Sequence, residues 1–194
     1  DRLRSRGLGD VYKRQYYMTM NCIDIDSSQH ELYDSWRKLY TVSFPIFEQR
    51  TQEQQEKAFS CADYHLVGYS EGDMFVGFIS YWEFGSYRYI EHFAVHQGLR
   101  GRGYGSEILN AFLRSTSKIV LLEIDPIVDS VSRARLRFYR KCGFHENPFA
   151  HTHPPYREGY PPHSLVVLTS PRSITENEYR IFSTDLTEVV MQQG

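Results

Sequence analysis

The sequence predicts a single α/β domain in which a sheet is flanked by helices. Two observations support this class. Residues 64–96 carry three runs with the β-branched and aromatic content of strands, separated by glycine-containing turns. Two successions of strand, loop and helix then follow, over residues 88–115 and 118–142. With 194 residues, of which 41% are hydrophobic, the chain can bury one sizeable core, and no linker or internal repeat divides it.

The first elements are a short strand and two helices. A strand is expected over residues 20–25, and the Asp26, Ser27 and Ser28 that follow can cap a helix. One face of this first helix carries four apolar side chains, Leu32, Trp36, Leu39 and Tyr40. The helix ends at Phe44-Pro45, and TQEQQEKAFSCA predicts a second short helix.

Residues 64–96 predict a hairpin and a third strand. The runs YHLVGY and MFVGFISYW flank a turn at Glu71, Gly72 and Asp73, which is the arrangement of a β-hairpin. Gly85 and Ser86 mark another turn, after which RYIEHFAVH forms the third strand.

Two amphipathic helices come next, with a buried strand between them. The first is expected over residues 104–115, and its apolar stripe consists of Ile108, Leu109, Phe112 and Leu113. The strand KIVLLEID closes at Pro126. The second helix runs over residues 129–142 and stops at Gly143. Its apolar side is expected to consist of Val131, Ala134, Phe138 and Cys142.

The C-terminal part predicts two late strands and a helix. The strands are FHENPF and SLVVLTS, and the loop between them is rich in proline, histidine and tyrosine. A last helix is expected over residues 174–191.

The opening DRLRSRGLGDVYKRQ has no usable apolar period and five basic side chains, at Arg2, Arg4, Arg6, Lys13 and Arg14. It resembles a translated sequencing adapter more than a protein element, although a basic nucleic-acid arm is an alternative. We expect residues 1–17 to be a non-native or disordered leader, and residues 18–194 to form the domain.

Composition narrows the class of protein. The net charge of −2 gives no overall basic field, so we expect no nucleic-acid partner. The chain has neither a run of about eighteen apolar residues nor a signal-peptide pattern, which predicts no membrane span and a cytoplasmic location. Cys22, Cys61 and Cys142 are odd in number and widely spaced, so they are expected to be reduced.

The stretch VHQGLRGRGYGSEIL is a glycine- and arginine-rich loop that leads into a helix, which is typical of an anion site. It does not fit a P-loop, because Tyr104-Gly105 follows where Lys and Ser or Thr are needed. A dinucleotide fingerprint fits nearly, with Gly101, Gly103 and Ser106, and with Glu123 at the expected distance. The polar Glu91-His92 in the preceding strand opposes that interpretation.

A third pattern, R-x-x-G-x-G, fits Arg100, Gly103 and Gly105. Glycines let backbone N–H groups point toward a pyrophosphate, and the start of the helix adds the positive end of its dipole. Arg100 and Arg102 then supply counter-charge. A solvated Gly-Arg loop without a ligand is the alternative.

Three runs, IEHFAVHQGLRGRGYGSEIL, LLEIDP and FYRKCGF, together resemble the GNAT superfamily of acyl-coenzyme A-dependent N-acyltransferases, in its single-domain bacterial form. The resemblance covers about Leu32 to Thr169 in element order. It implies a mixed, mostly antiparallel sheet of six to seven strands that splays open after the strand carrying Glu91, with pantetheine in the split. The implied cofactor residues are Phe93, Ala94, Val95, Arg100, Gly101, Arg102, Gly103, Tyr104, Gly105 and Ser106.

Amine acetylation needs a base, because an alkylamine with a pKa near 10.4 arrives protonated. Glu91 is the first candidate and His92 the second, since strand alternation places them on opposite faces. An ion pair of Glu91 with Arg88 or Arg133 is the structural alternative, and a water relay would make a base dispensable. In histone-type members of the superfamily, the catalytic glutamate aligns with Tyr89.

The leaving thiolate needs a proton donor. Tyr139 in FYRKCGF matches the acid tyrosine of the superfamily, although a core aromatic residue is the alternative. Backbone N–H groups near Phe93 to Val95 are expected to stabilise the oxyanion if the strand is bulged there.

The acceptor site is less specified. Glu48, between the first two helices, is expected to attract a cationic amine, and the loop HTHPPYREGYPPH is a candidate wall of this site. A zinc set of Cys142, His145, His151 and His153 is an alternative use of that region. It is not expected, because Cys142 should face the core.

The sequence therefore predicts an N-acetyltransferase that moves an acetyl group from acetyl-CoA directly to a primary amine of a small molecule or peptide. It predicts no metal. A non-catalytic acyl-CoA-binding regulatory module is the alternative. A homodimer, through a sheet edge or the C-terminal helix, stays open.

Overall fold

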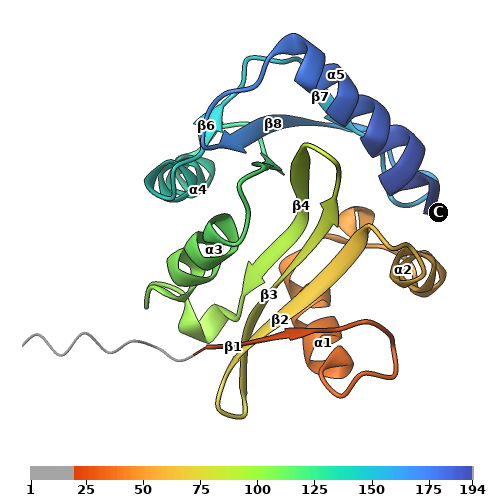
Figure 1. Cartoon of the computed structure of the whole chain (residues 1–194), viewed down its shortest axis with the longest axis vertical. Coiled ribbons are helices and arrows are strands. Elements are labelled where there is room, and N and C mark those ends of the chain that lie inside the picture. The colour runs from red at the N-terminus through yellow and green to blue at the C-terminus, as the bar shows by residue number, and fades with distance from the viewer. Residues whose placement is uncertain (1–19, 194) are drawn as a thin grey trace, which may run out of the picture.

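The computed structural model describes residues 20–193, so the predicted leader at residues 1–17 lies outside the described residues. One eight-stranded sheet runs through the domain in the order β1-β2-β3-β4-β5-β8-β6, and β7 pairs with β8 beside this path (Figure 1). The strands are β1 (Asn21–Asp24), β2 (Tyr64–Glu71), β3 (Met74–Glu83), β4 (Tyr87–Val95), β5 (Ile119–Ile124), β6 (His145–Glu146), β7 (His151–His153) and β8 (His163–Ser170). The extra strand relative to prediction is β7, within the proline-rich loop.

Helices cover both faces of the sheet. One apolar core lies under α1 (Tyr33–Ser43), α2 (Gln52–Phe59) and α5 (Glu176–Asp185), the last continued by a π-helical turn over Leu186–Val190. A second core lies under α3 (Tyr104–Arg114) and α4 (Ser130–Lys141) on the opposite face. Figure 1 shows α3 and α4 on one side of the central strands and α1 and α2 on the other. Both cores contact β4, so this strand lies at the centre of the domain.

The predicted elements of residues 51–124 form as expected. Thr51 caps α2 in a reciprocal capping box with Gln54. The hairpin of β2 and β3 turns at Gly72, whose φ of 56° is a left-handed conformation that glycine adopts without strain. The helix α3 begins at Tyr104 as predicted.

The first helix begins later than Asp26–Ser28 predict. It starts at Tyr33, and its N-cap residue Leu32 makes no capping hydrogen bond. Ser27 instead donates its hydroxyl to Asp26, and its carbonyl accepts the N–H of His30. Short polar side chains stabilise turns as well as helix starts, and here the turn is formed.

The apolar face predicted for α4 is confirmed at Cys142, which is buried, and at Phe138, which is partly buried against the core, but it is wrong at Val131 and Ala134. Asp129 caps the helix as expected, but Val131 is 65% exposed and Ala134 is also exposed. The buried side consists of Ser132, Leu136 and Tyr139. A spacing of three and four residues fits the helical period whether the stripe begins at Val131 or at Ser132. The pattern alone therefore does not determine which stripe faces the sheet.

Gly77 on β3 lets β4 approach closely. A Cβ atom at Gly77 would lie 2.5 Å from the carbonyl oxygen of Ala94 and 3.3 Å from the Cα atom of Val95. We expect Gly77→Ala to lower the free energy of unfolding by about 1–3 kcal/mol, because the backbone of β4 must shift. Urea denaturation measures this loss.

The matched control is Gly85→Ala. A Cβ atom at Gly85 would meet nothing within 4 Å, so we expect a change of no more than about 0.5 kcal/mol. Equal losses in the two variants would show that the contact between β3 and β4 tolerates a methyl group.

Candidate active site

The sheet opens between its two central strands. β4 and β5 pair in parallel only where Tyr87–Tyr89 lies beside Ile119–Leu121. Beyond Tyr89 the strands diverge, and a cavity of about 830 Å³ lies in the split. Since a strand points its N–H and C=O groups alternately to its two sides, part of the backbone of residues 90–95 has no neighbouring strand on this side. Those groups are available to a ligand.

The glycine loop forms one end of the cavity. Gly101 and Gly103 have φ angles of 77° and 92°, and Gly103 is the N-cap of α3 without a side chain to occupy the first N–H groups. Such an end attracts anions. Eight of the predicted cofactor residues line the cavity, namely Phe93, Ala94, Val95, Arg100, Gly101, Gly103, Gly105 and Ser106.

Two predicted cofactor residues do not line it. Arg102 is exposed outside the lining. Tyr104 is buried against the core, and its hydroxyl donates to Glu71 on β2, so the side chain turns away from the split.

Tyr139 reaches the cavity from α4. Its side chain is buried between Phe138 and Phe144, with ring centroids 5.1 and 5.7 Å away. Burial raises the pKa of Tyr139 to about 12, against the opposing charge of Arg135. The phenol is therefore protonated at neutral pH and has a proton to donate.

Glu91 lies at a β-bulge. Ser80 pairs with His92 and Tyr81 pairs with Ile90, which leaves Glu91 as the extra residue of β4. The bulge puts Glu91 and His92 on the same side of the sheet, since both contact Tyr156. The predicted opposite faces are therefore wrong, because the alternation assumed an unbroken ladder.

The carboxylate of Glu91 is fully engaged. It accepts hydrogen bonds from Arg50 Nε at 2.9 Å, Trp82 Nε1 at 2.8 Å and the Tyr156 hydroxyl at 2.9 Å, and Arg50 Nη2 lies 2.7 Å away. Burial raises the pKa of Glu91, but the charge of Arg50 together with the hydrogen bonds from Trp82 and Tyr156 lowers the pKa below the ordinary value. Its ion-pair partner is Arg50, not Arg88 or Arg133.

His92 is also engaged on both ring nitrogens. Nε2–H donates to the backbone carbonyl of Glu48 at 2.9 Å, and Nδ1 lies 3.4 Å from the Ser80 hydroxyl. Burial lowers the pKa of His92 to about 4, so the ring is neutral at pH 7. Because the Nε2–H group of His92 donates to the Glu48 carbonyl, the ring holds the backbone of Glu48 in place.

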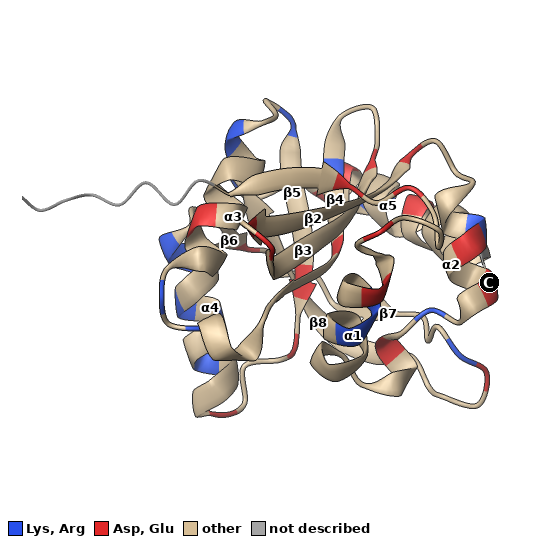
Figure 2. Ribbon diagram, turned by 90° about the horizontal axis from the view of Figure 1, so that it is seen from below, with Lys and Arg blue, Asp and Glu red and all other residues tan. Residues whose placement is uncertain are grey.

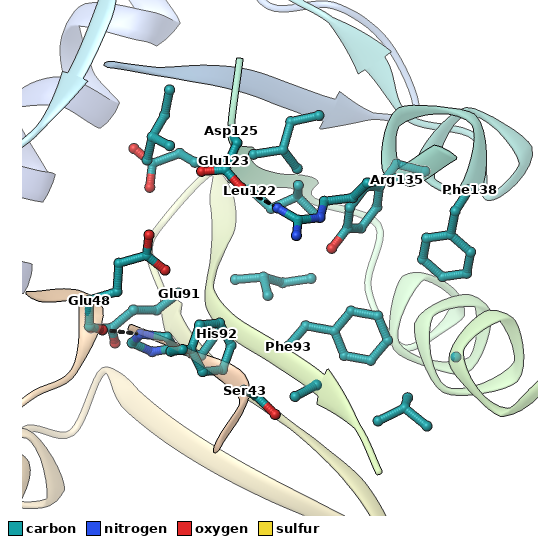
Figure 3. A pocket seen from close by; sticks show the side chains of 18 of the residues that line it. Ser43, Glu48, Glu91, His92, Phe93, Leu122, Glu123, Asp125, Arg135 and Phe138 are labelled. Carbon is teal, nitrogen blue, oxygen red and sulfur yellow. Dashed lines mark hydrogen bonds and ion pairs between the residues drawn. The ribbon is translucent and has the colours of Figure 1, made fainter. Parts of the chain in front are cut away.

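Glu48 projects into the other end of the cavity from a 3₁₀ turn over Ile46–Glu48. In Figure 3, Glu48 and Glu123 lie at one end of the cavity, while Phe93 and Phe138 lie at the other. Burial, reinforced by Asp125, raises the pKa of Glu48 to about 7. His163 Nε2 is 3.9 Å from its carboxylate.

The wall formed by the proline-rich loop and β8 carries residues whose roles the sequence left undefined. His153, Tyr156 and His163 line the cavity. Glu123 on β5 accepts the hydroxyl of Tyr89 at 2.5 Å and a contact from His151. The sequence predicts the loop HTHPPYREGYPPH as a wall of the acceptor site. In the structure, β7 at the start of this loop pairs with β8, and side chains of the loop line the cavity.

The side chains proposed for the zinc alternative do not form a metal site in the described part of the chain. Within residues 20–193, no group of three or more His, Cys, Asp or Glu side chains is arranged to hold a metal ion. Cys142 is buried in the core under α4, whereas His145 is exposed. In the same residues, no helix combines the length and apolar character needed to cross a membrane.

The fold is that of an acyl-transfer domain, as comparisons with known proteins show. The model of the acetyltransferase (GNAT) family matches residues 30–144, so the chain belongs to this family. A curated relative, the "Putative acetyltransferase YjbC" of Bacillus subtilis (strain 168), is 28% identical over 114 residues. That match spans 57% of this chain and 56% of the length of the relative.

Two solved structures show the same architecture. A GNAT-family protein from Bacteroides thetaiotaomicron is 27% identical with a TM-score of 0.82, and the match covers 88% of this chain and 98% of that one. Arabidopsis thaliana Naa50, solved with the bisubstrate analogue CoA-Ac-MVNAL, is 20% identical with a TM-score of 0.58. That match covers 80% of this chain and 99% of the Naa50 chain, and at this identity it shows the fold alone.

Proposed function

We propose that this protein transfers an acetyl group from acetyl-CoA to a primary amine of a small molecule or peptide by direct attack. The observation that supports the proposal is one cavity lined by the uncapped start of α3, by Tyr139 and by the carboxylates of Glu48 and Glu123. The CoA-peptide conjugate bound by Naa50 supports an amine acceptor on this fold.

The loop of residues 100–106 fits the diphosphate of CoA. Gly101 and Gly103 hold left-handed conformations that leave the first N–H groups of α3 uncapped, and Arg100 lies at the cavity. Basic residues also gather along α4, which packs beside this loop where Phe138 approaches Gly105 (Figure 2). Both features favour a polyanionic ligand.

When bound, acetyl-CoA supplies a thioester carbonyl that an amine can attack. Phe93, Ala94 and Val95 line the split, where those of their N–H groups that point away from β3 would stabilise negative charge on the carbonyl oxygen. Tyr139 would give its proton to the leaving sulfur. At the acceptor end, Glu48 would attract the ammonium group of the amine.

Glu91 and His92 support this site through other residues. Their hydrogen bonds to Arg50 and to the Glu48 carbonyl fix the segment between α1 and α2 against β4. Because Glu91 has a lowered pKa and four close donor contacts, and His92 has a pKa of about 4, both are weak proton acceptors at neutral pH.

Cofactor binding gives the direct test. We expect Arg100→Ala to weaken acetyl-CoA binding about tenfold or more in isothermal titration, since a charge-assisted hydrogen bond contributes about 1.5–3 kcal/mol. Arg102→Ala removes the same charge from a residue outside the lining, so a smaller loss is expected. A double variant should lose most of the affinity.

Two results would contradict this assignment. Equal losses in both single variants would mean that the loop acts only as a diffuse positive surface. If the unmodified protein does not bind acetyl-CoA, the acetyltransferase proposal fails, and the dinucleotide alternative returns.

A further inference from the structure

Glu48 differs from the other carboxylates that line the cavity. Glu91 is paired with Arg50, Glu123 accepts from Tyr89 and His151, and Asp125 is paired with Arg135. Within the described residues, the only ionisable side chain in contact with the Glu48 carboxylate is His163, whose Nε2 atom lies 3.9 Å from Oε1. Its side chain is 25% exposed, so the carboxylate is open to a ligand in the cavity.

The backbone that carries Glu48 is held firmly. Its N–H donates to Pro45 at 2.9 Å, and its carbonyl accepts Nε2–H of His92 at the same distance. The next residue, Gln49, is buried and donates its side-chain amide to the carbonyls of Thr41 and Phe44. A carboxylate on such a support keeps a defined direction into the cavity.

Burial is the main reason that the Glu48 carboxyl group exchanges protons near neutral pH, and the charges around it modify this effect. Asp125, which follows β5, and Glu123 on β5 oppose its ionisation, and Arg135 on α4 favours it. His163 on β8 has a lowered pKa, because burial and the neighbouring His153 disfavour its charge. The His163 ring is therefore neutral at pH 7 and does not hold Glu48 in an ion pair.

We infer that Glu48 is the proton acceptor of the reaction, taking a proton from the ammonium group of the acceptor amine in the cavity. This inference rests on the proposed function. It assigns the base to the segment between α1 and α2, and it gives Glu91 and His92 positioning roles.

The protons balance as follows. Glu48 takes one proton from the ammonium group and releases it to water, which leaves a nitrogen lone pair to form the C–N bond. The nitrogen loses a second proton as the C–S bond breaks with its electron pair on sulfur. Tyr139 protonates that sulfur and recovers the proton that the nitrogen lost. One proton is released per acetyl group transferred.

The kinetic test uses Glu48→Gln, which keeps the size of the side chain but cannot accept a proton. The probes are acetyl-CoA with 2-phenylethylamine, spermidine, kanamycin or a tetrapeptide with a free N-terminus, and the fastest amine is carried forward. We expect kcat to fall about 10²-fold, near the lower end for general-base catalysis, because water can accept the proton less efficiently. The matched control is Glu53→Gln, an exposed residue of α2 that is expected to behave as wild type.

The pH profile separates a base from a charge that merely attracts the amine. The wild-type kcat should fall as pH drops below about 7, where Glu48 becomes protonated, and Glu48→Gln should lose this limb. His163→Lys places a cation beside Glu48, so the limb should move to lower pH. A raised KM with an unchanged kcat and pH limb in Glu48→Gln would overturn the inference and leave only attraction.

A second measurement needs no turnover, so it tests the inference even if none of the four amines is a substrate. In ¹³C NMR of glutamate-labelled protein, the signal lost in Glu48→Gln should titrate near pH 7, above the ordinary pKa of glutamate. Titration of this signal at or below the ordinary value would overturn the inference, even if none of the four amines is acetylated. Failure to bind acetyl-CoA would instead overturn the proposed function itself.

Discussion

Replacing Arg50 by methionine is expected to lower the free energy of unfolding by about 3–5 kcal/mol, because it leaves a buried carboxylate without its counter-charge. Arg50 is 1% exposed, and Glu91 is its ion-pair partner at 2.7 Å. The guanidinium also donates to the Val190 carbonyl at 3.0 Å and lies over the rings of Trp82 and Tyr156. Urea denaturation at pH 7 measures the loss.

The pH dependence of the loss identifies its cause. Glu91 has a lowered pKa in the folded protein, so its contribution to stability is present above about pH 4.3, the unfolded value. It is lost as pH falls through the folded pKa. In Arg50→Met the carboxyl group loses the charge that lowers its pKa, so the stability deficit should shrink as the pH is lowered.

Two further variants control this experiment. Arg180→Met breaks an exposed pair with Glu176, and we expect a loss of less than about 1 kcal/mol. The double variant Arg50→Met, Glu91→Leu removes both charges and should be more stable than Arg50→Met alone. If Arg50→Met loses no more than Arg180→Met, the buried pair is not a major source of stability.

The ion pair of Arg50 and Glu91 is an example of a contact that local sequence patterns do not predict. The hairpin, the glycine loop and the strand with Glu91 follow from local periodicity and turn residues, and the structure forms each of them. Arg50 and Glu91 are 41 positions apart, and nothing in the spacing of either residue predicts their contact. The bulge that turns Glu91 to the same side of the sheet as His92 arises from the pairing of β4 with β3. The alternation of side chains along one strand does not predict such a bulge.

The acceptor end was predictable in outline but not in chemistry. The sequence pointed to Glu48 and to the loop around HTHPPYREGYPPH, and both line the cavity. The pKa of Glu48, by contrast, is set first by burial and then by the charges of Asp125, Arg135 and Glu123. These groups come together only in the tertiary fold. The sequence can therefore predict that Glu48 lies at the site, but it cannot predict the protonation state of its side chain.

Tyr139→Phe is expected to lower the rate of acetyl transfer by about 10²–10⁴-fold, because it removes the proposed donor to the leaving sulfur. The ring is held between Phe138 and Phe144, and phenylalanine fills the same space without leaving a void. Acetyl-CoA affinity and the unfolding midpoint should therefore stay close to wild type. Stopped-flow measurement of the first turnover reports the chemical step separately from product release.

The leaving group gives this prediction its decisive control. A thioester whose thiol is more acidic than that of CoA, such as an acetylated thiophenol, leaves without protonation, so Tyr139→Phe should lose far less rate with it than with acetyl-CoA. Phe138→Leu changes the neighbouring wall of the cavity and should show no such dependence on the leaving group. An equal loss on both thioesters would make Tyr139 a packing residue, because a ring that only shapes the cavity has no reason to distinguish a good leaving group from a poor one.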